Sequence, residues 1–224
     1  MKKRILCAGI ASLAIATQAQ AFTWTDDSLA YIYGPYYREP GIVSAQQPGG
    51  ANIGKNILEF THADGFTYGT NFFNVDMLMS NAVDPANGSS SGAEEVYVVY
   101  RNDLSLSKLT GSGNFSFGPV SDIGINSGFN FDTKDTTYAP RGRELLLGPS
   151  VHLKVPGGFW QVALDGYKEW NNDGFHGPVN YHLTYTVESS WSIPLHLASL
   201  PLTLEGYLCV KGPKGYDYDV GTKT

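Results

Sequence analysis

Residues 181–191 read YHLTYTVESSW, and their side chains divide into two interleaved sets. The apolar and aromatic side chains share one parity: Tyr181, Leu183, Tyr185, Val187 and Trp191. The hydrophilic side chains share the other: His182, Thr184, Thr186, Glu188 and Ser190. Successive side chains of a β-strand point to opposite faces, so this pattern predicts a strand with one apolar and one hydrophilic face.

Two environments suit such a strand. About ten residues allow a tilted strand to cross a bilayer, with aromatic side chains near both rims. In a water-soluble sandwich the same apolar face would instead form the protein core. This strand alone leaves both environments open.

The amino-terminal residues indicate export. Met1-Lys2-Lys3-Arg4 is basic, residues 5–17 are mostly apolar, and Ala19-Gln20-Ala21 has the form of an A-x-A cleavage site. Together they predict a signal peptide over residues 1–21 that is cut after Ala21, leaving 22–224 as the mature domain. The apolar run is too short for a helical membrane anchor, which needs about 18 residues or more.

Composition excludes several classes of protein. Lysine and arginine number 15 against 21 acidic residues, a net charge of −6, and no basic block is present, which argues against nucleic acid as a partner. Only Cys209 remains in the mature chain, so a disulfide framework and a cysteine metal cluster are excluded. The 26 glycines, 12 prolines and 14 tyrosines favour strands, in a barrel or in a soluble sandwich.

The alternating pattern recurs along the mature chain, in about nine segments bounded by turn residues. These segments are 27–38, 55–63, 68–79, 94–106, 121–132, 144–155, 159–170, 181–191 and 202–210. A short turn at 156–158 contrasts with polar loops at 82–92, 133–142 and 171–178, an asymmetry typical of outer-membrane barrels. The pattern favours an all-β, antiparallel transmembrane β-barrel over a soluble sheet.

Several stretches resemble a known family. Residues 56–62 (NILEFTH) and 69–76 (GTNFFNVD) resemble the opening of the nucleoside-specific outer-membrane channels, the Tsx-like family with its OmpK branch. Residues 104–111 (LSLSKLTG) with 115–119 (FSFGP), and later 210–215 (VKGPKG), are similar to further segments of that family. The resemblance runs from about Trp24 onward. It implies a twelve-stranded antiparallel barrel with a narrow channel that passes nucleosides.

The chain departs from the family in its strand number. About nine strands is an odd number, whereas closed bacterial barrels have an even one. The final residues, 219–224, lack the terminal aromatic strand usual in such barrels. We therefore expect a barrel whose carboxyl-terminal strands are missing from this chain.

If the apolar parity faces lipid, the opposite parity lines the channel. These candidate lining residues are Glu59, Asp76, Tyr97, Arg101, Asp122, Asn126, Asn130, Gln161, Asp165, Tyr167, Glu169, His182, Glu188, Glu205 and Tyr207. Tyrosine rings can stack on a nucleobase, for about 1–3 kcal/mol per base, and carboxylates and amides can accept hydrogen bonds from ribose hydroxyls. An acidic lining also repels the phosphates of nucleotides. The alternative is that these charges pair with one another, with Arg101 and Lys154 each neutralising neighbouring carboxylates, and only support the fold.

Catalysis finds little support. The five histidines show no H-E-x-x-H spacing. His152 and Ser150 lie on the same face of a predicted strand, but any two residues two positions apart on a strand do so, and this does not indicate a catalytic pair. We expect no catalytic residues, no metal and no cofactor. The expected partners are outer-membrane lipid and permeating nucleosides. Two alternatives stay open: a barrel serving mainly as a surface receptor, for phage at its loops, or as a structural protein, and a soluble exported β-sandwich that binds carbohydrate.

Overall fold

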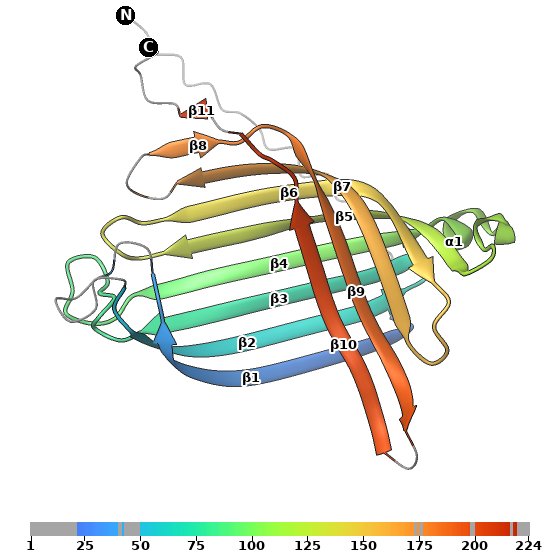
Figure 1. Cartoon of the computed structure of the whole chain (residues 1–224), viewed down its shortest axis with the longest axis horizontal. Helices are drawn as coiled ribbons and strands as arrows, with labels where there is room; N and C mark the ends of the chain where they lie inside the picture. The colour runs from blue at the N-terminus through green and yellow to red at the C-terminus, as the bar shows by residue number, and fades with distance from the viewer. Residues whose placement is uncertain are drawn as a thin grey trace, which may run out of the picture.

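The computed structural model shows a single antiparallel β-sheet that curls through 281° into an open half-barrel (Figure 1). The structure describes residues 22–39, 42, 50–172, 174, 177–197, 200–215 and 217–218. The predicted signal peptide, with its cleavage residues Ala19 and Ala21, and residues 219–224 lie outside this part of the chain. The expectation of an all-β antiparallel fold is confirmed.

The described part contains eleven strands and two short helical turns. In chain order they are β1 (Trp24–Tyr37), β2 (Ile53–Phe66), β3 (Gly69–Ser80), β4 (Glu94–Ser105), α1 (Leu106–Thr110), η1 (Gly113–Phe115), β5 (Val120–Lys134), β6 (Arg141–Leu153), β7 (Phe159–Asn172), β8 (Pro178–Asn180), β9 (Thr184–Leu197), β10 (Leu200–Lys211) and β11 (Asp217–Tyr218). None of the described helices is long and apolar enough to cross a membrane.

Each strand from β1 to β7 pairs with the next, and the pattern then changes. The first part of β7 pairs with β9 and its end pairs with β8, while β10 pairs with β9 and β11 with β8. The described sheet therefore has nine rows: β1 to β7, then β8 with β9, then β10 with β11. In Figure 1, β1 to β7 lie stacked, and β9 and β10 run steeply across the view. A two-sheet sandwich is not observed among the described strands.

Several observed strands begin or end a few residues away from the predicted segments, and β8 and β11 were not predicted. Residues 181–183 lie outside the strands, and β9 instead begins at Thr184 and continues to Leu197. The strand predicted over 94–106 ends at Ser105, because its hydroxyl accepts a hydrogen bond from the backbone N–H of Lys108 (3.1 Å) and caps α1. Gly111, at φ 66°, ends that helix. Alternating leucines and serines over 104–107 resemble a strand, so periodicity alone does not reveal the cap.

The register of the strands defines two faces. Directly opposite residues of an antiparallel pair lie on the same face, so Glu59, Asp76, Tyr97 and Asp132 occupy one face on four successive strands. Side chains of β4 and β9 meet on this face although three rows separate the strands, so it is the concave, inner face. The opposite face, which carries Leu147, is the outer face.

The pattern of burial on these two faces is the reverse of the pattern in a water-soluble sheet, because apolar side chains are exposed and polar side chains are covered. On the outer face Leu147 is 63% exposed, Ile125 and Leu204 are also exposed, and Val187 is half-buried. On the inner face Asp165 is 1% exposed, and most polar side chains from β4 to β9 are covered. The apolar parity therefore lies outside and the hydrophilic parity inside.

The two ends of the half-barrel carry different connections. Residues 67–68 and 154–158 make close turns at what we call the short-turn end, where α1 also lies and where β9 ends and β10 begins. Residues 81–93 and 135–140 connect strands at the opposite, long-loop end, where β1 and β7 also end and β2 begins. The connection between β4 and β5, which contains α1, is an exception to the predicted arrangement of short turns at one end and long loops at the other, because it is a long connection at the short-turn end.

Buried ion pairs fasten the long-loop end to the inner face. Lys134 contacts Asp84 of the β3–β4 loop at 2.7 Å, and Lys55 contacts Glu95 at 3.2 Å. Lys55 also pairs with Glu39, in the segment that follows β1. Both lysines are buried, so these pairs hold neighbouring connections against the end of the inner face.

Close packing of β6 against β7 depends on a glycine. A Cβ on Gly148 would lie 2.1 Å from Leu164 O and 2.7 Å from Asp165 Cα, whereas a Cβ on Gly166 has only Leu147 O nearby, at 3.6 Å. We expect Gly148→Ala to lower the free energy of unfolding by about 1–3 kcal/mol, the usual cost of overpacking. Gly166→Ala serves as the control and should not lower it. Urea titration followed by tryptophan fluorescence measures both, and equal effects would contradict the close approach of β7 to Gly148.

Candidate functional site on the inner face

The structure gathers nearly all the predicted lining residues on one surface. Fourteen of the fifteen lie on the inner face by strand register: Glu59, Asp76, Tyr97, Arg101, Asp122, Asn126, Asn130, Gln161, Asp165, Tyr167, Glu169, Glu188, Glu205 and Tyr207. The exception is His182, which lies between β8 and β9 and whose backbone N–H donates to Lys214 O (2.9 Å). That these residues line a channel stays a prediction.

An ion pair crosses the inner face at its middle. Arg101 of β4 meets Glu188 of β9 in a bidentate contact, Nε to Oε2 at 2.7 Å and Nη2 to Oε1 at 2.8 Å. The hydroxyl of Tyr207 donates to Glu188 Oε1 as well (2.8 Å). This pair, which we call the cross-face strut, spans the rows of β5, β6 and β7 and links β4 to β9 across the curved sheet.

A chain of hydrogen bonds extends from the strut toward the long-loop end. The strut guanidinium donates to Asn130 Oδ1 (2.8 Å), and Asn130 Nδ2 donates to Glu144 Oε2 (2.6 Å). Lys211 Nζ donates to Glu144 Oε1 and to the Tyr167 hydroxyl, each at 2.8 Å, and that hydroxyl donates to Glu169 Oε2 (2.7 Å). Tyr167 is 1% exposed, so its ring is not available to stack on a solute as the sequence suggested.

A second group of contacts converges on Asp103, toward the short-turn end. Asp103 accepts hydrogen bonds from Ser150 Oγ and from Gln161 Nε2 (2.9 Å), and its Oδ1 lies 2.7 Å from His152 Nε2. The carboxylate stands between the serine and the histidine. This order lacks the direct nucleophile-to-base contact that a hydrolytic triad requires.

One part of the inner face carries acidic side chains at neighbouring positions, and Asp165 Oδ1 elsewhere on this face is, like Asp76 Oδ1, buried without a hydrogen-bond partner. Glu59, Asp76, Tyr97 and Asp132 occupy consecutive positions across β2 to β5, and we call them the acidic row. Among the described ion pairs none involves its three carboxylates, and Asp76 Oδ1 is buried without a hydrogen-bond partner. Like charges directly opposite each other repel, so the acidic row would gain from a hydrogen-bond donor or a cation.

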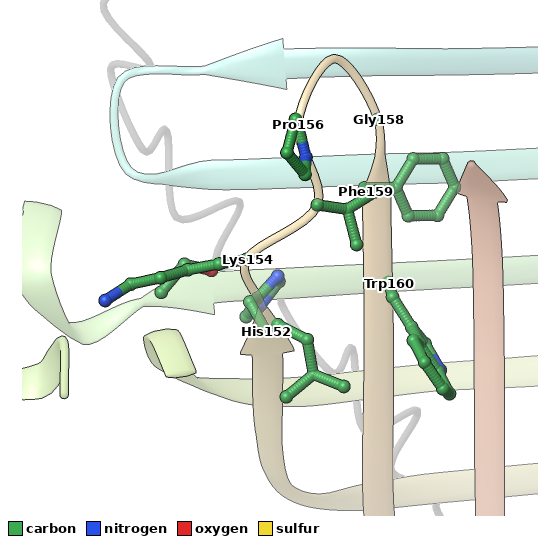
Figure 2. A pocket seen from close by; sticks show the side chains of 9 residues that line it. His152, Lys154, Pro156, Gly158, Phe159 and Trp160 are labelled. Carbon is green, nitrogen blue, oxygen red and sulfur yellow. The ribbon is translucent and has the colours of Figure 1, made fainter. Parts of the chain in front are cut away.

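A hollow of about 460 Å³ lies at the short-turn end, around the β6–β7 turn (Figure 2). Its lining residues are Ser121, His152, Leu153, Lys154, Val155, Pro156, Gly158, Phe159 and Trp160. His152 belongs to the inner face and Trp160 to the outer face, so the hollow spans the rim of the sheet. Lys154 Nζ is already bound to Gly118 O (2.9 Å). The acidic row is therefore the better candidate site.

Metal binding has no candidate in the described part of the chain, where no three histidine, cysteine or acidic side chains are arranged to hold an ion. Comparison with known proteins found no matching protein-family model, curated protein or solved structure. Function therefore rests on the two faces of the sheet, and the family resemblance stays a prediction.

The sequence prediction missed residues that organise the inner face. Asp103, Glu144 and Lys211 each contact two or more inner-face groups, yet none was among the candidates. The alternation pattern could have identified Asp103, which lies two residues after Arg101 on the same face. It could also have identified Glu144, which is on the hydrophilic parity of the predicted segment 144–155. Lys211 lay beyond the predicted end of its strand.

The cross-face strut generates a stability prediction. Arg101→Ala leaves Glu188 as a buried charge without its partner, and such a loss costs about 3–5 kcal/mol of unfolding free energy. The double variant Arg101→Ala/Glu188→Ala should recover part of that loss, because no uncompensated charge remains. Urea unfolding of the two single variants and the double variant measures the coupling. Additive losses would show that the strut does not join β4 to β9.

Proposed function

We propose that this chain forms the larger part of an outer-membrane β-barrel through which nucleosides, or similar small polar solutes, diffuse. The observation that carries this proposal is the reversed burial of the two faces. A continuous exposed apolar surface of this extent marks contact with lipid or another apolar partner. A hydrophilic interior suits a water-filled path for solutes.

The strand lengths agree with a bilayer. Strands β2, β3 and β4 contain 14, 12 and 12 residues, and about 9–11 residues suffice for a tilted strand to span the hydrocarbon core. Close turns at one end and longer connections at the other are the usual arrangement of outer-membrane barrels. These features support insertion with the short-turn end toward the periplasm.

A closed barrel requires further strands. Strands β1 and β10 both run from the short-turn end to the long-loop end, so they cannot pair antiparallel with each other. An odd number of additional strands restores antiparallel closure. Nine rows have eight intervals, about 35° each (281°/8), so the remaining 79° (360° − 281°) holds one further strand at this curvature. We propose three, in keeping with the twelve strands implied by the family resemblance, in a closed barrel that curls less tightly than the open sheet.

The acidic row is the proposed solute site. From β4 to β10 most inner-face carboxylates already have partners, whereas Glu59, Asp76 and Asp132 retain acceptor capacity beside the half-buried ring of Tyr97. A nucleobase can stack on that ring while the carboxylates accept hydrogen bonds from ribose hydroxyls or amino groups. Unpaired negative charge also repels phosphates, so nucleosides rather than nucleotides fit the site. Weak binding here is compatible with passage, since a solute must also leave.

Membrane insertion is tested with a lysine on the outer face. Leu147 lies at the middle of β6, where a lysine facing lipid costs about 2–4 kcal/mol. We expect Leu147→Lys to fold poorly into phospholipid vesicles. Leu109→Lys, at an exposed leucine of α1, should fold as the wild type does. Equal folding of both variants, or a wild-type chain that stays in the aqueous phase without detergent, would contradict the membrane assignment.

The solute site is tested by neutralising two carboxylates. We expect Glu59→Gln/Asp76→Asn to reduce the preference for cations and to weaken block of single-channel conductance by added thymidine several-fold. Glu94→Gln, a charge loss at the end of β4 on the outer parity, is the matched control and should change neither quantity. Thymidine block that is the same in all three proteins would exclude the acidic row as the solute site.

A further inference from the structure

Among the described strand residues, the lysine and arginine side chains of the outer face lie at one place. Arg141, Arg143 and Lys168 lie on the outer face of β6 and β7 near the long-loop end, and we call them the basic rim. Both arginines are exposed. In the register Arg143 stands opposite Trp170, and Lys168 opposite Leu145.

The basic rim has no acidic partner among the described residues. Lys168 Nζ donates to Asn180 Oδ1 (2.6 Å) and to Tyr181 O, both neutral groups, and none of the described ion pairs involves Arg141 or Arg143. The adjacent carboxylates of β6 and β7 point to the inner face, where they pair with lysines. The rim is therefore a local excess of positive charge on a chain whose net charge is −6.

The rim also lies at the border of the apolar surface. Leu145 and Leu147, both exposed, follow Arg141 and Arg143 along the same face of β6. Trp170 is 40% exposed beside them, and Lys168 Nζ lies 5.5 Å from its ring centroid. Tryptophan next to basic residues at the end of an apolar band is typical of the level of lipid headgroups.

Two acidic side chains of β1 and β2, Asp27 and Asp64, lie on the outer face near the short-turn end. Near the short-turn end His62 lies between two carboxylates, with Nδ1 2.6 Å from Asp27 Oδ1 and Nε2 3.2 Å from Asp64 Oδ2. Anionic headgroups would be repelled there and attracted at the basic rim. The two ends of the outer face thus distinguish one membrane surface from the other.

We propose that the basic rim binds the phosphate of an anionic, phosphate-bearing lipid headgroup, a role that rests on the membrane assignment proposed above. Arginine recognises phosphate with two parallel hydrogen bonds, and two exposed arginines two residues apart on one face can contact one headgroup together. Lipid is the occupant that satisfies both parts of this surface, because its phosphate meets the arginines while its acyl chains cover Leu145 and Leu147. A free anion would cover only the charges.

Lipid titration tests this proposal. The full chain in neutral detergent micelles is titrated with phosphatidic acid or with phosphatidylcholine of the same acyl chains, and bound lipid is counted by native mass spectrometry. Each basic residue near an anionic surface is worth about a fivefold change in affinity, so Arg141→Gln/Arg143→Gln should weaken phosphatidic acid binding about 25-fold. Phosphatidylcholine binding should not change. Lys154→Gln removes one positive charge at the short-turn end and should leave both affinities unaltered.

Two further measurements, one on a variant that keeps the charge and one with added inorganic phosphate, distinguish a lipid site from poor folding and from binding of a free anion. Arg141→Lys/Arg143→Lys keeps the charge, so it should retain most of the affinity even if the glutamine variant folds poorly. Excess inorganic phosphate should not displace the lipid. Equal phosphatidic acid binding by the wild type and the glutamine variant, or complete displacement by inorganic phosphate, would overturn the lipid site. A chain that enters neither micelles nor vesicles would instead overturn the membrane assignment itself.

Discussion

Alternation of side chains across the paired strands of the antiparallel sheet, with register shifts near the end of β1 and at the start of β5, is the constraint on which the rest of this protein depends. Opposite residues of paired strands share a face. The residues of β2 that face inward therefore determine, through the pairing, which residues of the other described rows face inward. A slip of one residue in any strand would exchange its apolar and polar sides. The separation of an apolar outer face from a hydrophilic inner face is therefore a property of the whole sheet.

Curvature turns that separation into a three-dimensional site. On a flat sheet Arg101 and Glu188 would be three rows apart and could not meet, but the concave surface brings them into bidentate contact. Buried charges are expensive unless they are paired and hydrogen-bonded, and the partners of the strut, among them Asn130 and Tyr207, meet that requirement. Most of the polar interior from β4 to β10 thereby supports the fold.

Some inner-face carboxylates already have hydrogen-bond or ion-pair partners and others do not, and this difference bears on function. Where carboxylates already have partners, they have little capacity left for a solute, and Tyr167 shows this for an aromatic ring as well. The acidic row retains that capacity because β3 contains no lysine or arginine and Lys55 of β2 pairs with Glu39 and Glu95 instead. On the outer face, the basic rim near the long-loop end and Asp27 with Asp64 near the short-turn end would favour one orientation of the proposed channel across a membrane.

The amino-acid sequence by itself determined the all-β class, the approximate limits of nearly every strand and the facing of fourteen candidate residues, because strand periodicity is a local property. It missed the start of β9 and the cap of α1, where tertiary contacts and a single serine override a weak alternation. Only the tertiary structure decided which inner-face residues are satisfied by partners and which are not. Contacts such as that of Arg101 with Glu188 join residues 87 positions apart, and their existence depends on how far the sheet curls.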